Sequence, residues 1–485
     1  MNVNPITRLD YPDPDVIRVE DTYYMVSTTM HFMPGCEILQ SFDLVHWEHV
    51  TYVYETLDHT DAQQLKSGQN IYGQGMWAAS LRYHEGRFYI CFVANDTRKT
   101  YLYTSEKIDG PWKKQLIEGF YHDGSLLFDE DGRNYIVYGN DEIWITELNE
   151  DLTAPKKDGL HRLLVSDHKN PELGYEGSHI QKINGYYYIF LIHSLRDRWM
   201  RTEACFYSDS LEGEFTGGDV LCDDRGYCGQ GVAQGGIVDT PDGKWYAMLF
   251  QDSGAVGRIP ILLPVTWKDH FPVFGQNGHV PEEIEVHSTR PGYIYQPLVG
   301  SDDFCNGLLP RWQFNHDPDP RYYHLDALQG TYTITTREVC TELTQAVNTL
   351  TQRMSYPSCA AEVTVDASAL KEGDVAGLCA LQGCYAAVGI TKHHGKYEVL
   401  MLDKKEDGIL DMTEGTVVES HQMDFRLEAD FCNMKDEARC YYRVNKGDWL
   451  PIGTVHKLYF KLDHFTGCRF GLFCYAAEET GGSAC

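Results

Sequence analysis

The segment EGSHIQKINGYYYIFLI, residues 176–192, contains two short apolar runs separated by Asn184-Gly185. Asn-Gly is among the strongest short-range signals for a β-hairpin, because a tight turn of this kind needs residues with positive φ. The run after the turn begins with three tyrosines, and aromatic residues favour strands. The segment therefore predicts two antiparallel strands joined by a tight turn.

The same plan occurs five times in the first 290 residues. The other copies are PDPDVIRVEDTYYMVS (12–27), WAASLRYHEGRFYICFV (77–93), DGSLLFDEDGRNYIVYG (123–139) and QGGIVDTPDGKWYAMLF (234–250). Successive copies are separated by about 45 to 65 residues, which leaves room for about four strands each. Repetition of a four-strand unit around an axis predicts a five-bladed β-propeller. A β-sandwich with repeated hairpins is the alternative, but it does not account for the spacing.

Equivalent positions in the five copies mark the start of the first strand. Counting back from the aligned tyrosine in each copy leads to five residues: Asp13, Trp77, Asp123, Glu176 and Gln234. Because the innermost strands of a propeller line its central axis, we expect these five residues to meet at one mouth of the channel.

Three of these residues are carboxylates, and together they point to carbohydrate chemistry. Two carboxyl groups on opposite sides of a sugar ring are the minimum set for glycoside hydrolysis, and a third nearby raises the pKa of the acid by repulsion. Taken singly, Asp13 could be a cap and Asp123 a turn residue. Trp77 offers a flat apolar face to the ring. Asp15 has no acidic counterpart in the other copies, so we expect it to act mainly in stability.

Two other functions are open at this point. A sugar-binding propeller without catalysis, a lectin, would keep Trp77 but would not need a carboxylate at Asp13. A retaining fructosidase propeller is typified by Asn-Asp-Pro and Arg-Asp-Pro motifs, which do not occur here as a pair. We therefore prefer a hydrolase.

Composition limits the partners and the location. The chain of 485 residues has a formal net charge of −30, which would repel nucleic acid and anionic lipid. No apolar stretch approaches the length of about 18 residues that is needed to span a bilayer, and the start of the sequence lacks a signal-peptide pattern. The 15 cysteines include no C-x-x-C pair, which indicates reduced thiols. We expect a cytoplasmic protein that binds neither membranes nor nucleic acid.

The hairpin repeat is lost after about residue 295. Beyond it, seven segments alternate or run apolar at strand length between polar turns. They are GTYTITT, CAAEVTVDAS, VAGLCAL, YAAVGITK, KYEVLML, FRLEADF and RCYYRV. We predict an all-β protein with a propeller at residues 1–295 and an antiparallel β-sandwich at residues 296–485.

Several motifs in order resemble glycoside hydrolase family 43. They are NPITRLDYPDPDVIRVEDTYYM, SFDLVHWEHV, GQGMWAASLRYHEGRFYICF, HDGSLLFDEDGRNYIVYG, YEGSHIQKINGYYYIF and GRIPILLPVTWKDHFPVFG. They cover residues 4 to about 277. The resemblance implies a five-bladed propeller enzyme, a β-xylosidase or α-L-arabinofuranosidase, with a concanavalin-like C-terminal sandwich. Its substrates would be small plant-polysaccharide oligosaccharides, and the choice between xylose and arabinose stays open.

The resemblance also implies residue roles. Asp13 would be the general base, Glu176 the general acid, and Asp123 the residue that tunes the acid's pKa. Arg258 matches an arginine that lies beside the base and binds substrate hydroxyls. The family inverts anomeric configuration, so Asp13 would activate water, which requires carboxyl groups roughly 6.5 to 9.5 Å apart.

The chain also departs from the family pattern. Many members have a histidine at the position of Gln234, where it helps to hold a calcium ion on the propeller axis; we expect no required cofactor and leave the metal open. In some relatives a sandwich loop sends an aromatic residue into the pocket, and Leu381, Gln382 and Tyr385 lie near the matching loop. A sandwich beside the pocket could also support a homo-oligomer.

Overall fold

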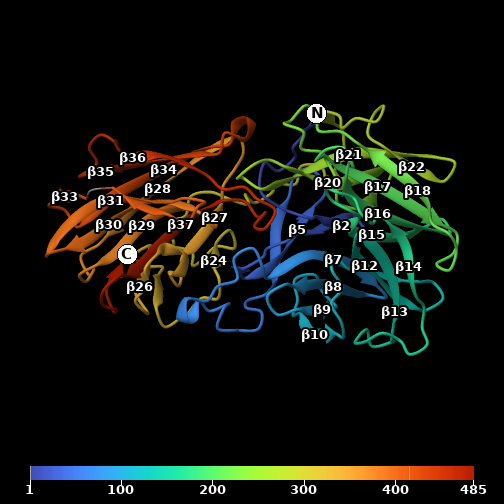
Figure 1. Cartoon of the computed structure of the whole chain (residues 1–485), viewed down its shortest axis with the longest axis horizontal. Coiled ribbons are helices and arrows are strands. Elements are labelled where there is room, and N and C mark those ends of the chain that lie inside the picture. Colours follow the sequence, from blue (N-terminus) through green and yellow to red (C-terminus); the bar gives the residue numbers. More distant parts are fainter. Residues whose placement is uncertain (1, 414) are drawn as a thin grey trace.

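The computed structural model describes residues 2–413 and 415–485 and has two β-rich halves side by side. The N-terminal half, blue to green in Figure 1, is the propeller, and the C-terminal half, yellow to red, is the sandwich. Three short 3₁₀ turns, Lys66–Gly68, Leu343–Gln345 and Cys432–Met434, are the helical elements of the described ranges. The predicted all-β class is therefore confirmed.

The described part of the propeller contains five four-stranded antiparallel sheets, one at each predicted hairpin. The first is β2 (Asp15–Val19), β3 (Thr22–Val26), β5 (Gly35–Ser41) and β6 (Glu48–Tyr54); the second is β7 (Met76–His84), β8 (Arg87–Ala94), β9 (Lys99–Ser105) and β10 (Lys113–Ile117). The third is β11 (Ser125–Phe128), β12 (Asn134–Asn140), β13 (Glu142–Leu148) and β14 (His161–Ser166). The fourth is β15 (Glu176–Ile183), β16 (Tyr186–Ser194), β17 (Arg201–Ser208) and β18 (Thr216–Leu221). The fifth is β19 (Ile237–Asp239), β20 (Trp245–Asp252), β21 (Arg258–Lys268) and β22 (Phe271–Phe274).

The first strands of the five sheets form a ring. β2 contacts both β7 and β19, and β11 contacts both β7 and β15. Gln181 in β15 donates to the carbonyl oxygen of Ile237 in β19 at 2.8 Å, which joins the remaining pair. The chain closes where β1 (Asn2–Val3) pairs with β23 (Glu283–Ile284).

Each of these first strands has a residue of positive φ at its start. The residues and φ values are Asp13 (52°), Ala78 (31°), Asp123 (48°), Gly177 (66°) and Gln234 (58°). Non-glycine residues rarely adopt this left-handed region, and each costs of order 1–3 kcal/mol, so such positions concentrate at functional sites. A left-handed residue thus recurs at, or directly after, each of the five strand-start positions.

The sandwich is built on one large sheet and one four-stranded sheet. The large sheet runs in the order β32 (Leu410–Met412), β31 (Lys396–Lys404), β30 (Tyr385–His393), β29 (Asp374–Leu381), β37 (Arg469–Ala476), β27 (Leu350–Arg353), β24 (Gln313–Asn315) and β4 (Phe32–Met33), with β33 (Thr416–Val418) also on β31. The second sheet is β28 (Ser358–Asp366), β34 (Gln422–Asp430), β35 (Glu437–Arg443) and β36 (Leu450–Lys457). A small third sheet contains β25 (Tyr323–Asp326), β26 (Thr331–Thr335) and β38 (Ser483–Ala484). Fully buried Val388 and Phe425 belong to the core between the two larger sheets.

The two halves share a sheet and a core. β4 lies in the propeller sequence but pairs with β24, where Phe314 is opposite Met33. Propeller residues Val256 and Ile259 belong to the same buried cluster as the sandwich interior. Because the halves interlock in this way, the division at residue 295 stays a prediction.

Three buried histidines from both halves meet at this junction. The ring of His31 lies 4.8 Å from the ring of His316 and 5.3 Å from that of His464, measured between centroids. Burial lowers the pKa of His316 to about 3 and that of His464 to about 4. The junction therefore favours neutral imidazoles.

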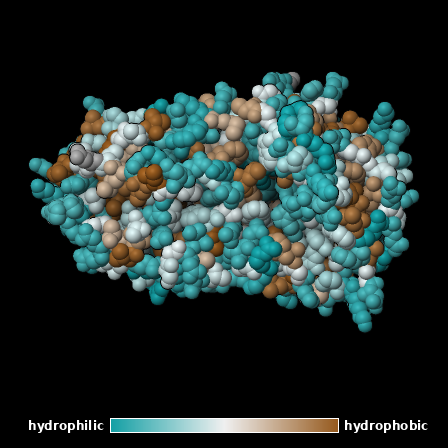
Figure 2. Space-filling model, in the orientation of Figure 1, coloured by the Kyte–Doolittle hydropathy of each residue, from teal (hydrophilic) through white to brown (hydrophobic). Residues whose placement is uncertain are grey.

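The face in Figure 2 is mostly hydrophilic, with hydrophobic residues in small separate groups. Within residues 2–413 and 415–485, no helix has the length and apolar character needed to cross a membrane. All 15 cysteines are free thiols, as their spacing predicts.

Candidate active site

A pocket of about 190 Å³ lies where the first strands of the propeller begin. All six residues singled out from the sequence line it: Asp13, Trp77, Asp123, Glu176, Gln234 and Arg258. The remaining lining residues are His122, Leu173, Trp199, Arg201, Leu462 and Phe465. The repeat phase thus places residues from five different sheets around one small cavity.

Asp13 is buried and held through both oxygens. The Nη1 of Arg258 donates to its Oδ1 at 2.6 Å, and the hydroxyl of Thr28 donates to its Oδ2 at 2.5 Å. Arg258 is itself fixed, because its Nε donates to Asp252 at 3.2 Å. A carboxylate with a charged partner and a hydroxyl donor stays in one orientation, as a group that must meet one water requires.

Asp123 and Glu176 belong to neighbouring sheets, and a carboxyl oxygen of one lies within 4.8 Å of a carboxyl oxygen of the other. The backbone N–H of Gly177 donates to Asp123 Oδ2 at 3.0 Å, and the side chain of Asn140 donates to Glu176 Oε2 at 2.6 Å. Burial and the charges of Glu176 and Asp13 raise the pKa of Asp123 to about 6, against the opposing charge of His122. Asp123 therefore gains and loses its proton close to neutral pH.

A general acid is expected to have a raised pKa, but the pKa of Glu176 is lowered. Burial raises its pKa, but the adjacent His122 imidazole and the charges of Arg201 and Arg258 outweigh burial and hold the pKa below its ordinary value. The charge of Asp123, with help from Glu176, raises the pKa of His122 to about 9 against burial. Sequence reasoning missed His122, although it directly precedes Asp123.

A loop of the sandwich completes the pocket. Phe465 packs edge-on against Trp77, with 5.0 Å between ring centroids, and its ring lies 3.6 Å from the guanidinium carbon of Arg258. Leu462 of the same loop also lines the cavity. The sandwich therefore covers the arginine that holds Asp13.

The residues that the sequence placed near this loop are not the ones that reach the pocket. Leu381, Gln382 and Tyr385 are buried and do not line the pocket. Gln382 instead donates to the carbonyl oxygens of His464 and Thr466, at 3.0 and 2.6 Å, and so supports the loop from behind. No periodicity or turn motif in the sequence marks Phe465.

Asp10 ties this loop to the propeller. Its Oδ1 accepts from the backbone N–H of Arg258 at 2.8 Å, and its Oδ2 accepts from that of Gly467 at 2.7 Å. One buried carboxylate thus fixes both the strand that carries Arg258 and the segment that follows Phe465.

Comparison with known proteins identifies the chain. The model of glycosyl hydrolases family 43 matches residues 3–272, and the model of the beta xylosidase C-terminal concanavalin A-like domain matches residues 301–485. The chain belongs to glycoside hydrolase family 43. This family 43 chain is accordingly a glycoside hydrolase, and the predicted concanavalin-like sandwich is confirmed.

Individual relatives of the family 43 chain cover nearly all of it. A "Beta-xylosidase" of Formosa agariphila is 27% identical over 542 residues, covering 99% of this chain and 88% of the relative. A "Xylosidase/arabinosidase" of Butyrivibrio fibrisolvens is 23% identical over 99% of this chain and 97% of the relative. A solved structure of a bifunctional GH43-CE protein of Bacteroides eggerthii has a TM-score of 0.92 and 42% identity; the match covers all of this chain and 62% of that one.

The family 43 pocket gives no support to a metal ion at Gln234. The backbone N–H of Gln234 donates to Glu203, whose pKa burial raises well above its usual range, so that the carboxyl is neutral. One amide and a neutral carboxyl do not make the oxygen-rich shell that calcium needs. Whether the propeller axis holds a metal ion stays open. In the described ranges, two groups of three side chains bring nitrogen or oxygen atoms within 4.8 Å of one another: Glu372, His393 and His394 on the sandwich, and His122, Asp123 and Glu176 in this pocket.

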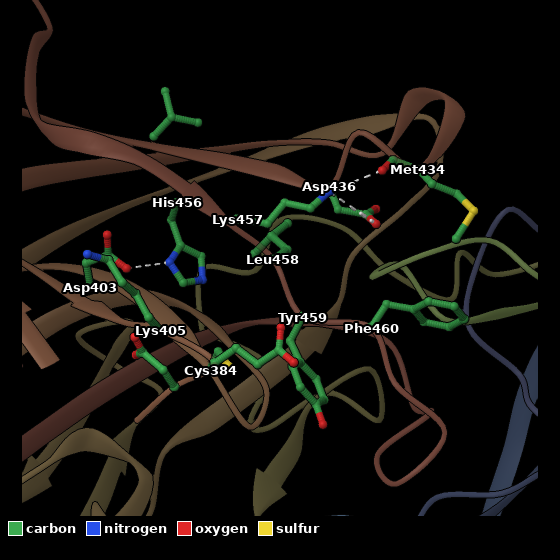
Figure 3. A pocket seen from close by; sticks show the side chains of 13 residues that line it. Cys384, Asp403, Lys405, Met434, Asp436, His456, Lys457, Leu458, Tyr459 and Phe460 are labelled. Atoms are coloured by element: carbon green, nitrogen blue, oxygen red, sulfur yellow. Dashed lines mark hydrogen bonds and ion pairs between the residues drawn. The ribbon is translucent and has the colours of Figure 1, made fainter. Parts of the chain in front are cut away.

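A larger cavity of about 760 Å³ lies in the sandwich of the family 43 enzyme. Figure 3 shows Asp403 beside His456, whose Nδ1 is 2.7 Å from the carboxylate, with Asp436 on the far side. This cavity contains none of the six predicted residues. Residues 458–460 line it, whereas Leu462 and Phe465 line the propeller pocket, so one loop separates the two. The candidate active site is the propeller pocket, which carboxyl groups from three sheets line.

Proposed function

We propose that the enzyme is an inverting exo-glycoside hydrolase that releases single xylose or arabinose units from β-xylosides or α-L-arabinofuranosides. Its substrates would be oligosaccharides of plant polysaccharides. The observation that carries the proposal is one small pocket in which three carboxyl groups from three different sheets meet: Asp13, anchored by Arg258, and the neighbouring Asp123 and Glu176. The names of the relatives, a beta-xylosidase and a xylosidase/arabinosidase, support the two sugars.

In the proposed reaction, water attacks the anomeric carbon from the side of Asp13. Asp13 accepts one proton of this water while Glu176 donates a proton to the departing glycosidic oxygen. Arg258 holds Asp13 in one orientation before attack. Asp123, at hydrogen-bond distance from the Gly177 amide next to Glu176, sets the proton affinity of the acid.

The size of the pocket favours removal of terminal units. A volume of about 190 Å³ is below the range of about 300–1,000 Å³ found for drug-sized ligands and suits one sugar ring. Trp77 supplies the flat face on which such a ring stacks. Phe465 and Leu462 close one side of the cavity, so a longer chain would have to leave through the open side.

The test is an aryl-glycoside panel with Asp13→Ala and Glu176→Ala. We expect the native enzyme to cleave aryl β-xyloside, aryl α-arabinofuranoside or both, and each variant to lose on the order of 10²–10⁴-fold in kcat. Glu85→Gln, in the exposed turn between β7 and β8, is the matched control and should keep native activity. Proton NMR of the first-formed sugar should show the inverted anomer.

Two outcomes would overturn this proposal. Native-like turnover by either variant would remove the catalytic assignment. Sugar binding with no turnover by the native protein on any substrate of the panel would favour the lectin alternative.

A further inference from the structure

His122 occupies a distinctive place in the pocket. Its Nε2 lies 3.6 Å from Glu176 Oε2 and 3.7 Å from Asp123 Oδ2, between the two carboxyl groups. Its ring is 6.3 Å from that of Trp77, and its side chain is 21% exposed, through the pocket that it lines. The imidazole can therefore exchange a proton with either carboxyl group after a shift of less than 1 Å, since a hydrogen bond of this kind is about 2.8 Å long.

The charged groups of the pocket come from five elements. Asp13, Asp123 and Glu176 are negative when ionised, and Arg201 and Arg258 are positive. Of these, Asp123 acts most strongly on His122, followed by Glu176 and then Asp13. Asp252 is buried and pairs with both arginines, at 2.8 and 3.2 Å. Four acidic groups therefore face two arginines, and a proton held on the cluster lowers this excess of negative charge.

This proton has a definite place in the resting enzyme. The pKa of His122 is raised to about 9, whereas that of Glu176 lies below its ordinary value. Near neutral pH the proton is thus on the imidazole, and Glu176 is ionised. A general acid in this state has to acquire its proton before the leaving group departs.

We propose that His122 is a positioning residue that holds, next to Glu176, the proton that Glu176 delivers to the leaving group. This inference rests on the proposed function and adds to it the origin of the acid's proton. The proton moves from His122 Nε2 to Glu176 Oε2 and from there to the glycosidic oxygen as the bond between carbon and oxygen breaks. Asp13 meanwhile takes the proton that the attacking water loses. After product release, Asp13 gives that proton to solvent and His122 takes one up, so one water is consumed for each bond cleaved.

His122→Gln tests the proposal, because glutamine keeps a polar side chain of similar length but does not titrate. The pH profile of kcat/KM of the native enzyme should lose activity on the basic side as the cluster's last proton leaves, near the His122 value of about 9. Without the imidazole this proton has to reside on the two carboxyl groups, which hold a proton less tightly; in the native cluster, beside His122, the pKa of Asp123 is about 6. We therefore expect the basic limb of the variant to move at least one pH unit lower.

A series of leaving groups gives a second, independent readout. A phenyl xyloside needs protonation of its leaving oxygen, so the variant should lose about 10-fold or more in kcat/KM at pH 8. A dinitrophenyl xyloside departs without an acid and should change less than about 3-fold. His324→Gln, an exposed histidine of the sandwich, is the matched control and should leave both readouts unchanged.

The outcomes separate this inference from the proposed function. If the native enzyme cleaves no glycoside of the panel, the proposed function fails. If it cleaves them and Glu176→Ala shows the expected loss, but His122→Gln keeps the native basic limb or loses activity equally on both leaving groups, only the role of His122 is overturned.

Discussion

Phe465 offers the sharpest test of the two-domain active site. The sandwich supplies this residue, yet its ring lies 3.6 Å from the guanidinium carbon of Arg258 and 5.0 Å from the ring of Trp77. We predict that Phe465→Ala lowers kcat/KM while the propeller itself stays folded. The arginine would lose the surface that orients it toward Asp13.

The size of the effect follows from these two contacts. A desolvated cation–π contact is worth about 2 kcal/mol, and an edge-to-face aromatic pair adds about 1 kcal/mol. If both are expressed in the transition state, the loss of about 3 kcal/mol corresponds to about 100-fold in kcat/KM, since 1.4 kcal/mol is a factor of ten. Phe465→Tyr should recover most of the activity because it keeps the ring.

The assay is kcat/KM on the best aryl glycoside of the panel, with melting temperature as the check on folding. Phe460→Ala is the matched control, because Phe460 lies in the same loop but lines the sandwich cavity; it should change kcat/KM by less than about 3-fold. Native activity in Phe465→Ala, or an equal loss in both variants, would refute the reasoning.

Three further predictions concern buried ionisable groups. Arg258→Met leaves Asp13 buried without its cation, so we expect kcat to fall by at least about 100-fold and the melting temperature to drop; native kinetics would contradict this. Asp15→Asn leaves Arg82 without its buried carboxylate and should cost about 3–5 kcal/mol of unfolding free energy, measured by denaturant titration, with a smaller effect on activity than Asp13→Ala. Because the pKa of His31 is lowered well below 6.5, mainly by burial, the unfolded chain binds protons that the fold does not, and stability should fall as the pH drops below about 6.5. His31→Phe should flatten this fall in the free energy of unfolding, measured by denaturant titration at several pH values, by up to about 1.4 kcal/mol per pH unit, and an unchanged slope would count against it.

The propeller could be predicted from the sequence because its signals are local. A turn like Asn184-Gly185 recurs in each hairpin, and the strand-start residue always lies about the same number of residues before it. This constant spacing was enough to predict that Asp13, Asp123 and Glu176 share one pocket. Propeller geometry converts equal sequence positions into spatial neighbours, so no long-range information was needed.

The rest of the pocket depends on contacts that no repeat encodes. Phe465 reaches the site because Asp10 and Gln382 hold its loop. Asp10 is 457 residues away in the chain from its partner in the loop, and Gln382 is 82 residues away from its partner. His122 had a sequence signal in its place beside Asp123, but its role depends on the distance to Glu176 on another sheet. Side-chain electrostatics of this kind cannot be inferred from spacing.

The pairing of β4 with β24 has a consequence for how such enzymes can change over evolution. If the sandwich were replaced by an unrelated domain, β4 would lose its partner β24, and Arg258 would lose the cover of Phe465. Exposed strand edges of this kind promote aggregation. The sandwich is therefore not a freely exchangeable module. We expect the two halves to be inherited together, and a chimaera to fold only if its donor provides both the strand that pairs with β4 and the loop that carries the phenylalanine.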